Sequence, residues 1–187
     1  MSKKYFVCVY TGASDRIDDV HRKEVRKLGN IIADNGFSLV YGAGSTGCMG
    51  EVAAGVKEKD GYVMGITPHF MKSFESIFEC DNTVMVDTMG ERKTLMEKHA
   101  DVFVVAPGGI GTMDEFFQIL TLKYLNQLHA PIFLLNKDGY YNPLIALINQ
   151  IINEKFATAK IATLYEVIDS ADDEKFIKCL EEIKEKE

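Results

Sequence analysis

Residues 101–115 read Asp-Val-Phe-Val-Val-Ala-Pro-Gly-Gly-Ile-Gly-Thr-Met-Asp-Glu. The apolar run 102–105 predicts a buried strand, because its β-branched and aromatic residues leave no polar face. Gly108, Gly109 and Gly111 then turn the chain into a predicted helix. Glycines let a backbone approach a ligand closely, and a helix N-terminus offers N–H groups and the positive end of its dipole to an anion. The stretch therefore predicts a phosphate site at the end of a buried strand.

Glu115 lies three residues after Thr112 and so stands beside the predicted phosphate site. Two interpretations of this carboxylate are open. Either it acts chemically on the bound ligand, or it belongs to a capping box in which Thr112 caps the helix and Glu115 bonds back to the N–H of the cap. Spacing alone favours the capping box.

A second polar segment, Met89-Gly90-Glu91-Arg92-Lys93, starts another predicted helix one strand earlier. Open parallel sheets bind ligands outside the carboxyl ends of their strands, where the following loops converge. We therefore expect Arg92 and Lys93 to supply cations to the phosphate site. The alternative is a solvated helical turn, because Thr88 and Glu91 also have the spacing of a capping box. Cations at a helix N-terminus oppose the helix dipole, and a bound anion would offset that cost.

Strand-like and helix-like segments alternate along the whole chain. Strands are expected at 5–10, 37–41, 62–66, 83–86, 102–105, 131–135 and 166–168. Helices are expected at 18–35, 47–59 and 89–99, after the glycine turn, from 142 onward, and after a capping box at Ser170–Asp173. Residues 69–83 are expected to be irregular. The alternation predicts a single-domain α/β fold over residues 1–187, doubly wound and Rossmann-like, with a mostly parallel sheet and helices on both faces.

The segment Gly42-Ala43-Gly44-Ser45-Thr46-Gly47 fits the G-x-G-x-x-G pattern of dinucleotide-binding loops. Such a loop needs an acidic residue about 20 positions later to hold the ribose hydroxyls. The corresponding stretch, Gly65-Ile66-Thr67-Pro68, has no carboxylate, and the pattern follows the second predicted strand instead of the first. We therefore expect the segment to line a nucleotide pocket, with Gly44 and Ser45 nearest the ligand.

Composition narrows the classes of function. The 21 basic and 28 acidic residues give a net charge of −7, which argues against a general nucleic-acid or anionic-membrane surface. Four widely spaced cysteines without a C-x-x-C pair indicate reduced, buried thiols, and the four histidines show no metal-site spacing. A start without a signal-like apolar region, and no apolar stretch approaching about 18 residues, predict a cytoplasmic protein.

Three segments together resemble the LOG family of cytokinin riboside 5'-monophosphate phosphoribohydrolases, whose members are often labelled lysine decarboxylases. Residues 107–115 match its Pro-Gly-Gly-x-Gly-Thr-x-x-Glu signature, and Arg92-Lys93 resembles the end of its Met-His-x-Arg-Lys motif. Residues 41–50 resemble its upstream glycine-rich segment. The resemblance extends from about residue 5 to about residue 170 and covers nearly the whole chain.

The sequence departs from the family pattern at three positions. Gly90 stands where the family usually has His, Asp114 where it often has Glu, and Ala43 where Gly is common. These departures bear on substrate preference more than on reaction type.

The resemblance implies roles for individual residues. Arg92 and Glu115 are expected to be catalytic. Substrate binding is expected of a larger set, Gly44, Ser45, Glu75, Met89, Lys93, Gly108, Gly109, Ile110, Gly111, Thr112, Met113, Asp114 and Thr121. A one-residue length difference in the segment 69–88 leaves Glu79 as the alternative to Glu75. A homodimer that uses no metal and no organic cofactor is also implied.

The sequence thus predicts a hydrolase that cleaves the N-glycosidic bond of a purine nucleoside 5'-monophosphate, with N6-substituted AMP favoured by resemblance. The alternative is a nucleotide or phosphorylated-cofactor carrier that uses the same glycine turn without turnover. Both bind phosphate, but a carrier for an anion gains nothing from the carboxylate of Glu115 beside it. The sequence leaves the identity of the base open.

Overall fold

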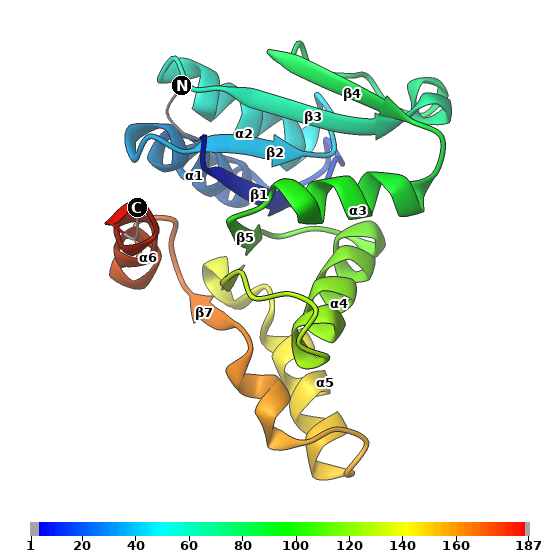
Figure 1. Ribbon diagram of the computed structural model, residues 1–187, viewed down its shortest axis with the longest axis vertical. Helices are drawn as coiled ribbons and strands as arrows, with labels where there is room; N and C mark the ends of the chain where they lie inside the picture. The colour runs from blue at the N-terminus through cyan, green and yellow to red at the C-terminus, as the bar shows by residue number, and fades with distance from the viewer. Residues whose placement is uncertain (1–3, 186–187) are drawn as a thin grey trace.

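The computed structural model describes residues 4–185 and contains a seven-stranded parallel sheet in the order β4-β3-β2-β1-β5-β6-β7. Within these residues the strands are β1 (Phe6–Tyr10), β2 (Ser38–Tyr41), β3 (Val63–Pro68), β4 (Asn82–Val86), β5 (Val102–Val105), β6 (Ile132–Leu135) and β7 (Glu166–Ile168). The α-helices are α1 (Asp19–Asp34), α2 (Gly47–Glu58), α3 (Met89–His99), α4 (Ile110–Tyr124), α5 (Asn142–Asn153) and α6 (Glu174–Glu185). Short 3-10 helices are η1 (His69–Ser73), η2 (Lys137–Gly139) and η3 (Ala159–Thr163). Figure 1 shows β4, β3, β2, β1 and β5 following one another down the molecule. None of the helices in the described range is both long and apolar enough to cross a membrane.

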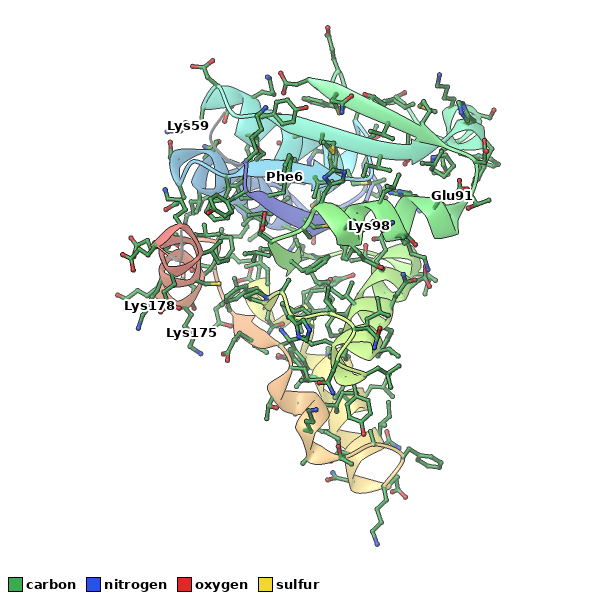
Figure 2. The ribbon with its side chains drawn as sticks, in the orientation of Figure 1. Phe6, Lys59, Glu91, Lys98, Lys175 and Lys178 are labelled. Atoms are coloured by element: carbon green, nitrogen blue, oxygen red, sulfur yellow. The ribbon has the colours of Figure 1, made fainter. Side chains whose placement is uncertain are left out.

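Helices cover both faces of the sheet, and the side chains of β1, which point alternately to one face and the other, illustrate this. Val7 and Val9 lie in a core shared with α1, α2 and α6, whereas Phe6 and Cys8 pack in a second core with α3, α4 and α5. Successive side chains of a strand point to opposite faces, so a strand that is apolar throughout needs a cover on each side. Figure 2 shows Phe6 inside the body of the protein and Lys178 on α6 pointing away from it. The prediction of a doubly wound α/β fold is confirmed.

Most predicted elements lie within a residue or two of the observed ones, and two details differ. The segment 69–83, expected to be irregular, forms η1 at its start and enters β4 at its end. The capping box expected at Ser170 is wrong, because α6 begins at Glu174. The Asp173 carboxylate accepts a hydrogen bond from the Lys175 N–H at 2.9 Å and so caps the helix in place of Ser170.

The strand order reverses between β1 and β5. From β1 the chain runs outward through β2, β3 and β4, and then crosses back to place β5 on the other side of β1. Loops that leave such a point form the crevice in which open α/β sheets bind ligands. The Gly12 N–H and the Thr11 hydroxyl both donate to the Pro107 carbonyl, at 3.1 and 2.8 Å, and so join the loops after β1 and β5. The fold therefore places the glycine turn at the predicted ligand edge.

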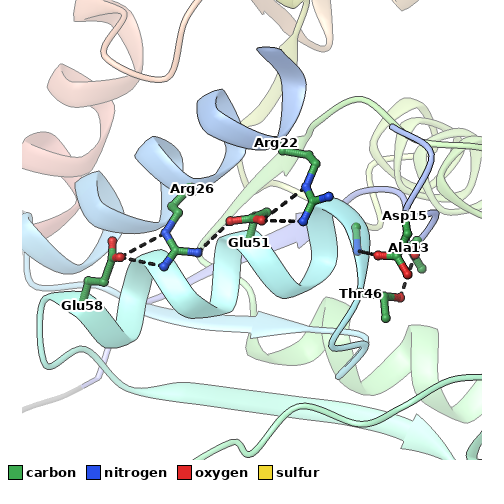
Figure 3. Close-up of polar contacts among 8 residues, drawn as sticks. Ala13, Asp15, Arg22, Arg26, Thr46, Glu51 and Glu58 are labelled. Atoms are coloured by element: carbon green, nitrogen blue, oxygen red, sulfur yellow. Dashed lines mark hydrogen bonds and ion pairs between the residues drawn. The ribbon is translucent and has the colours of Figure 1, made fainter. Parts of the chain in front are cut away.

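Helices α1 and α2 pack closely beside this crevice. The Glu51 carboxylate on α2 accepts from Arg22 at 2.9 Å and from Arg26 at 2.7 Å, and Arg26 also contacts Glu58 at 2.7 Å (Figure 3). Gly55 permits the close approach, since a Cβ there would lie 2.2 Å from the Arg26 carbonyl oxygen. These contacts fix the position of α2 relative to the crevice.

Candidate active site

A cavity of about 490 Å³ opens at the point where the strand order reverses. Its walls come from the loop after β1, the starts of α1, α2, α3 and α4, η1 and the residues after it, the glycine turn and the residue after η2. The predicted site residues in its lining are Glu75, Met89, Arg92, Gly108, Gly109, Gly111, Thr112, Asp114 and Glu115. Elements far apart in the sequence thus bring these residues together at one edge of the sheet.

Glu115 lies on the second turn of α4 and is 8% exposed. Burial raises the pKa of its carboxyl to about 7, because removal from water disfavours the charged form more than the Arg92 guanidinium favours it. The Arg92 Nη2 lies 3.9 Å from the Glu115 Oε1. A buried carboxyl that titrates near neutral pH is suited to general acid–base catalysis and to the stabilisation of a developing cation.

The capping-box interpretation of Glu115 is wrong. Helix α4 begins at Ile110 with Gly109 as its N-cap, so Thr112 already lies inside the first turn. The Thr112 side chain packs against Gly108, where a Cβ would lie only 2.1 Å from the hydroxyl oxygen. Glu115 therefore has no cap to bond and is available to the cavity.

The N-terminus of α4 is open to the cavity. Gly109 and Gly111 line it, and a Cβ at either position would meet no atom within 4 Å. Among residues 4–185, no group accepts a hydrogen bond from the N–H of Ile110, Gly111 or Thr112. Unpaired donors at the positive end of a helix dipole can bind an anion. This geometry agrees with the phosphate position expected from the glycine turn.

Arg92 is 7% exposed, so its interpretation as part of a solvated turn is wrong. The capping box beside it is nevertheless present, since the Glu91 N–H bonds the Thr88 hydroxyl oxygen at 3.1 Å and the Thr88 N–H bonds the Glu91 carboxylate at 3.2 Å. The Arg92 Nε donates to the Ile66 carbonyl at 3.2 Å. Glu91 can form the capping box while Arg92 points into the site, because successive residues of a helix point in different directions.

Glu75 lies on the cavity wall, whereas Glu79 is exposed outside it. Ser45 fixes the segment that carries Glu75, because its N–H and its hydroxyl both bond to the Ser76 carbonyl, at 2.9 and 3.0 Å. Burial raises the pKa of Glu75, and the Arg92 guanidinium opposes that rise. Two acidic side chains thus act on the same guanidinium.

The remaining predicted residues lie outside the cavity lining, and they are Gly44, Ser45, Lys93, Ile110, Met113 and Thr121. Lys93 reaches the rim through an ion pair with Asp114 at 2.9 Å. Ile110 is 87% exposed, Met113 packs against the second core, and Thr121 is exposed further along α4. Within the described part of the chain, no three His, Cys, Asp or Glu side chains are grouped to hold a metal ion.

The loop after β1, which no sequence motif singles out, also lines the cavity with Thr11–Ser14. Its place could have been inferred from the general rule for loops after parallel strands. Tyr140 and His21 line the cavity as well, and the family resemblance covers both residues without assigning a role to either. The Tyr140 hydroxyl donates to the Gly108 carbonyl at 2.6 Å, and the His21 ring packs edge-on against Tyr140 with 5.4 Å between centroids.

Comparison with known proteins finds relatives along most of the chain. A family model described as "Possible lysine decarboxylase" matches residues 49–175. The cytokinin riboside 5'-monophosphate phosphoribohydrolase LOG3 of Arabidopsis thaliana is 37% identical over 186 residues, covering 97% of this chain and 85% of the relative. The probable cytokinin riboside 5'-monophosphate phosphoribohydrolase LOGL5 of Oryza sativa subsp. japonica is 37% identical over 153 residues, covering 81% of this chain. The match spans 62% of the rice relative's length.

Two solved structures share the fold along nearly their whole length. The Moco carrier protein from Chlamydomonas reinhardtii has a TM-score of 0.72 at 20% identity, with 99% of this chain and 100% of that chain covered. The molybdenum cofactor binding protein from Rippkaea orientalis has a TM-score of 0.71 at 22% identity, with 99% and 98% covered. At these identities the likeness establishes the fold alone.

Proposed function

This chain belongs to the LOG family, and from that premise we propose that it hydrolyses the N-glycosidic bond of a purine nucleoside 5'-monophosphate. The products are the free base and ribose 5-phosphate. The observation that carries the proposal is the buried Glu115, which lies 3.9 Å from the Arg92 guanidinium beside an open helix N-terminus. This arrangement suits a substrate that is anionic at one end and develops positive charge at the reacting centre.

The 5'-phosphate binds at the N-terminus of α4. The N–H groups of Ile110, Gly111 and Thr112 donate to its oxygens, and the helix dipole favours its negative charge. Lys93 adds positive charge at the rim, where Asp114 holds its ammonium in place at 2.9 Å. A nucleoside leaves these donors without a partner, so we expect the phosphate to be required.

Hydrolysis breaks the bond between C1' and the base nitrogen, and the electron pair of that bond leaves with the base. The ribose then carries positive charge, which the carboxylates of Glu115 and Glu75 stabilise more in the transition state than in the ground state. Water forms the new bond to C1' and passes a proton to Glu115, whose pKa of about 7 suits a general base, and a proton returned to the departing nitrogen completes the free base. Arg92 keeps Glu115 available in its ionised form and assists departure of the base.

N6-substituted adenine is the base that we propose. Met49, Met71 and Met89 line the cavity, and flexible thioether side chains adapt to apolar groups of irregular shape. The names of the Arabidopsis and rice relatives specify cytokinin riboside 5'-monophosphates for those proteins. The methionine wall supports extending that substrate class to this chain.

A second candidate function is a carrier for a nucleotide or a phosphorylated cofactor. The open N-terminus of α4 favours it, because such a site binds an anion whether or not a reaction follows. Two proteins of the same fold are named as molybdenum cofactor binding or carrier proteins. The carboxyls of the half-buried Glu75 and the buried Glu115 count against a carrier, since a carboxylate beside a bound anion repels it and weakens its binding.

The test is to incubate the purified protein with AMP, an N6-prenylated AMP and the matched nucleosides, and to measure free base by chromatography. We expect turnover of the monophosphates alone, in the presence of EDTA and without added nicotinamide. Monophosphates that bind without release of base would favour the carrier. Equal kcat/KM for a monophosphate and its nucleoside would remove the phosphate site from the proposal.

A further inference from the structure

The glycine-rich segment 41–50 leads into α2, and the N-terminus of that helix is occupied by protein groups. The Asp15 carboxylate accepts a hydrogen bond from the Gly47 N–H at 3.1 Å (Figure 3). The Met49 N–H bonds the Gly12 carbonyl at 3.1 Å. Two of the first three N–H donors of this helix, those of Gly47 and Met49, are therefore already paired, unlike those of α4. The glycines of the segment need another explanation.

Gly42 directly follows β2, and the Arg92 guanidinium occupies the space beside it. A Cβ built on Gly42 would lie 1.7 Å from the Arg92 Nη2 and 2.8 Å from its Cζ. Contacts this short are not tolerated in a packed interior, so any side chain at position 42 must displace the guanidinium. The backbone of Gly42 lies outside the left-handed region, and its constraint is thus the space that Arg92 fills.

Arg92 is fixed on its other sides as well. Its Nε donates to the Ile66 carbonyl at 3.2 Å, and its Nη1 lies 3.8 Å from the Met89 sulfur. Arg92 is 7% exposed, and the free space beside it is the cavity that it lines together with Glu115. A displacement caused at position 42 would therefore reach the pair that Arg92 forms with Glu115.

We propose that Gly42 is a positioning residue, which acts by leaving the space in which Arg92 is held 3.9 Å from Glu115. Gly42 is not part of the cavity lining and acts through Arg92. The expected effect of Gly42 on kcat rests on the proposed hydrolase function. Its expected effect on the position of Arg92 and on stability does not.

Displacement of Arg92 has a defined effect on Glu115. The charged groups that act on this carboxyl are Arg92 and Lys93 on α3, Asp114 on α4, and Glu75 after η1. Of these, Arg92 supplies the atoms nearest to a Cβ at position 42. Arg92 lowers the pKa of Glu115, so its displacement raises that pKa further. A higher pH is then needed to ionise the carboxylate.

The kinetic test compares Gly42→Ala with Gly90→Ala, which adds the same methyl group to an exposed position on the helix of Arg92. A Cβ at Gly90 would meet only the Thr88 hydroxyl, at an ordinary 3.8 Å. We expect Gly42→Ala to lower kcat about tenfold or more and to move the acidic limb of kcat/KM upward by about one pH unit. Gly90→Ala should change neither. An unchanged kcat and acidic limb in Gly42→Ala would overturn the proposal.

A thermal unfolding comparison tests Gly42 independently of turnover. Gly42→Ala should lower the Tm of the otherwise unchanged protein, but should cause a clearly smaller loss in a chain that already carries Arg92→Ala, where the 1.7 Å contact is gone and the flexible end of Met49, 2.8 Å from the Cβ, is the close contact left. Equal losses in both backgrounds would assign the strain to Met49 or the backbone and overturn the proposal. Failure of the unchanged protein to hydrolyse any monophosphate would count against the proposed function alone and leave the Tm comparison standing.

Discussion

Glu115 is a residue on which burial and neighbouring charge act in opposite directions. Burial raises its pKa to about 7, and Arg92 limits that rise. If the ionised carboxylate carries catalysis, kcat/KM should fall as the pH drops below about 7, with the slope of a single proton. A pH profile from roughly pH 5 to 9 with an AMP-type substrate measures this. A kcat/KM that stays level down to about pH 5, as the ordinary glutamate pKa of 4.5 would give, would contradict it.

The same burial makes the charge of Glu115 unfavourable to the fold. A carboxyl whose pKa is raised from 4.5 to about 7 contributes stability below the unfolded value and loses it as the pH rises through the folded value. We expect Glu115→Gln to raise the free energy of unfolding at pH 8 by about 1 to 3 kcal/mol, and to leave it nearly unchanged at pH 4. Urea unfolding at the two pH values measures the difference. A variant that is less stable than the unchanged protein at pH 8 would refute this view of the site.

Motif spacing predicted Glu115 and Arg92 as site residues, and both line the cavity, but spacing could not decide how each is used. Whether Thr112 caps α4 depends on where the helix begins. Gly109 is the N-cap, so the helix has already begun when the chain reaches Thr112. His21 and Tyr140 could not be found from local sequence, because only the tertiary fold brings them beside the glycine turn.

Helices α1 and α2 are joined by two carboxylates on α2 that pair with arginines on α1. Glu51 is 18% exposed at its side chain and accepts from both Arg22 and Arg26, whereas Glu58 is 46% exposed and contacts Arg26. Burial alone would raise the pKa of Glu51, but the two arginines hold it below its ordinary value. Its contribution is therefore present above the unfolded pKa and is lost as the pH falls through the folded one.

We expect Glu51→Ala to lower the free energy of unfolding at pH 7 by about 0.5 to 1 kcal/mol, after allowance for solvent screening. Glu58→Ala, the matched control on the same helix, should have a smaller effect because its carboxylate is more exposed. Urea unfolding of both variants at pH 7 and again in acid gives the comparison. Equal losses at both pH values would show that the Glu51 charge is not responsible.

The hydrophobic pattern of the sequence predicted the strands and helices well. Strands that are covered on both faces are apolar throughout, so they are easily distinguished from the helical segments between them. The order of the strands was not contained in that pattern. Placing β5 beside β1 depends on pairing between residues far apart in the chain, such as Val7 with Val102. Convergence of the glycine turn and α3 was nonetheless predictable from the general rule for parallel sheets.

At the scale of the whole molecule, several large apolar side chains are exposed along α4, α5 and the turn that follows. These are Ile110 at 87%, Phe156 at 86%, Leu125 at 57% and Leu147 at 47% exposed. We expect these helical faces to form the interface of a homodimer, because exposed apolar surface of this kind marks association sites. Size-exclusion chromatography with light scattering should give twice the chain mass of 20.9 kDa. A monomer at micromolar concentration would contradict the expectation.

The kcat of Glu115→Gln shows whether Glu115 is a catalytic carboxylate. Glu91→Gln is the matched control, since Glu91 is the glutamate that does cap a helix at this edge. We expect Glu115→Gln to lower kcat by about 100-fold or more while the Kd for ribose 5-phosphate changes by less than about threefold, and we expect Glu91→Gln to keep its kcat. A near-normal kcat in Glu115→Gln would contradict the account and move the catalytic role to Glu75 or Asp114.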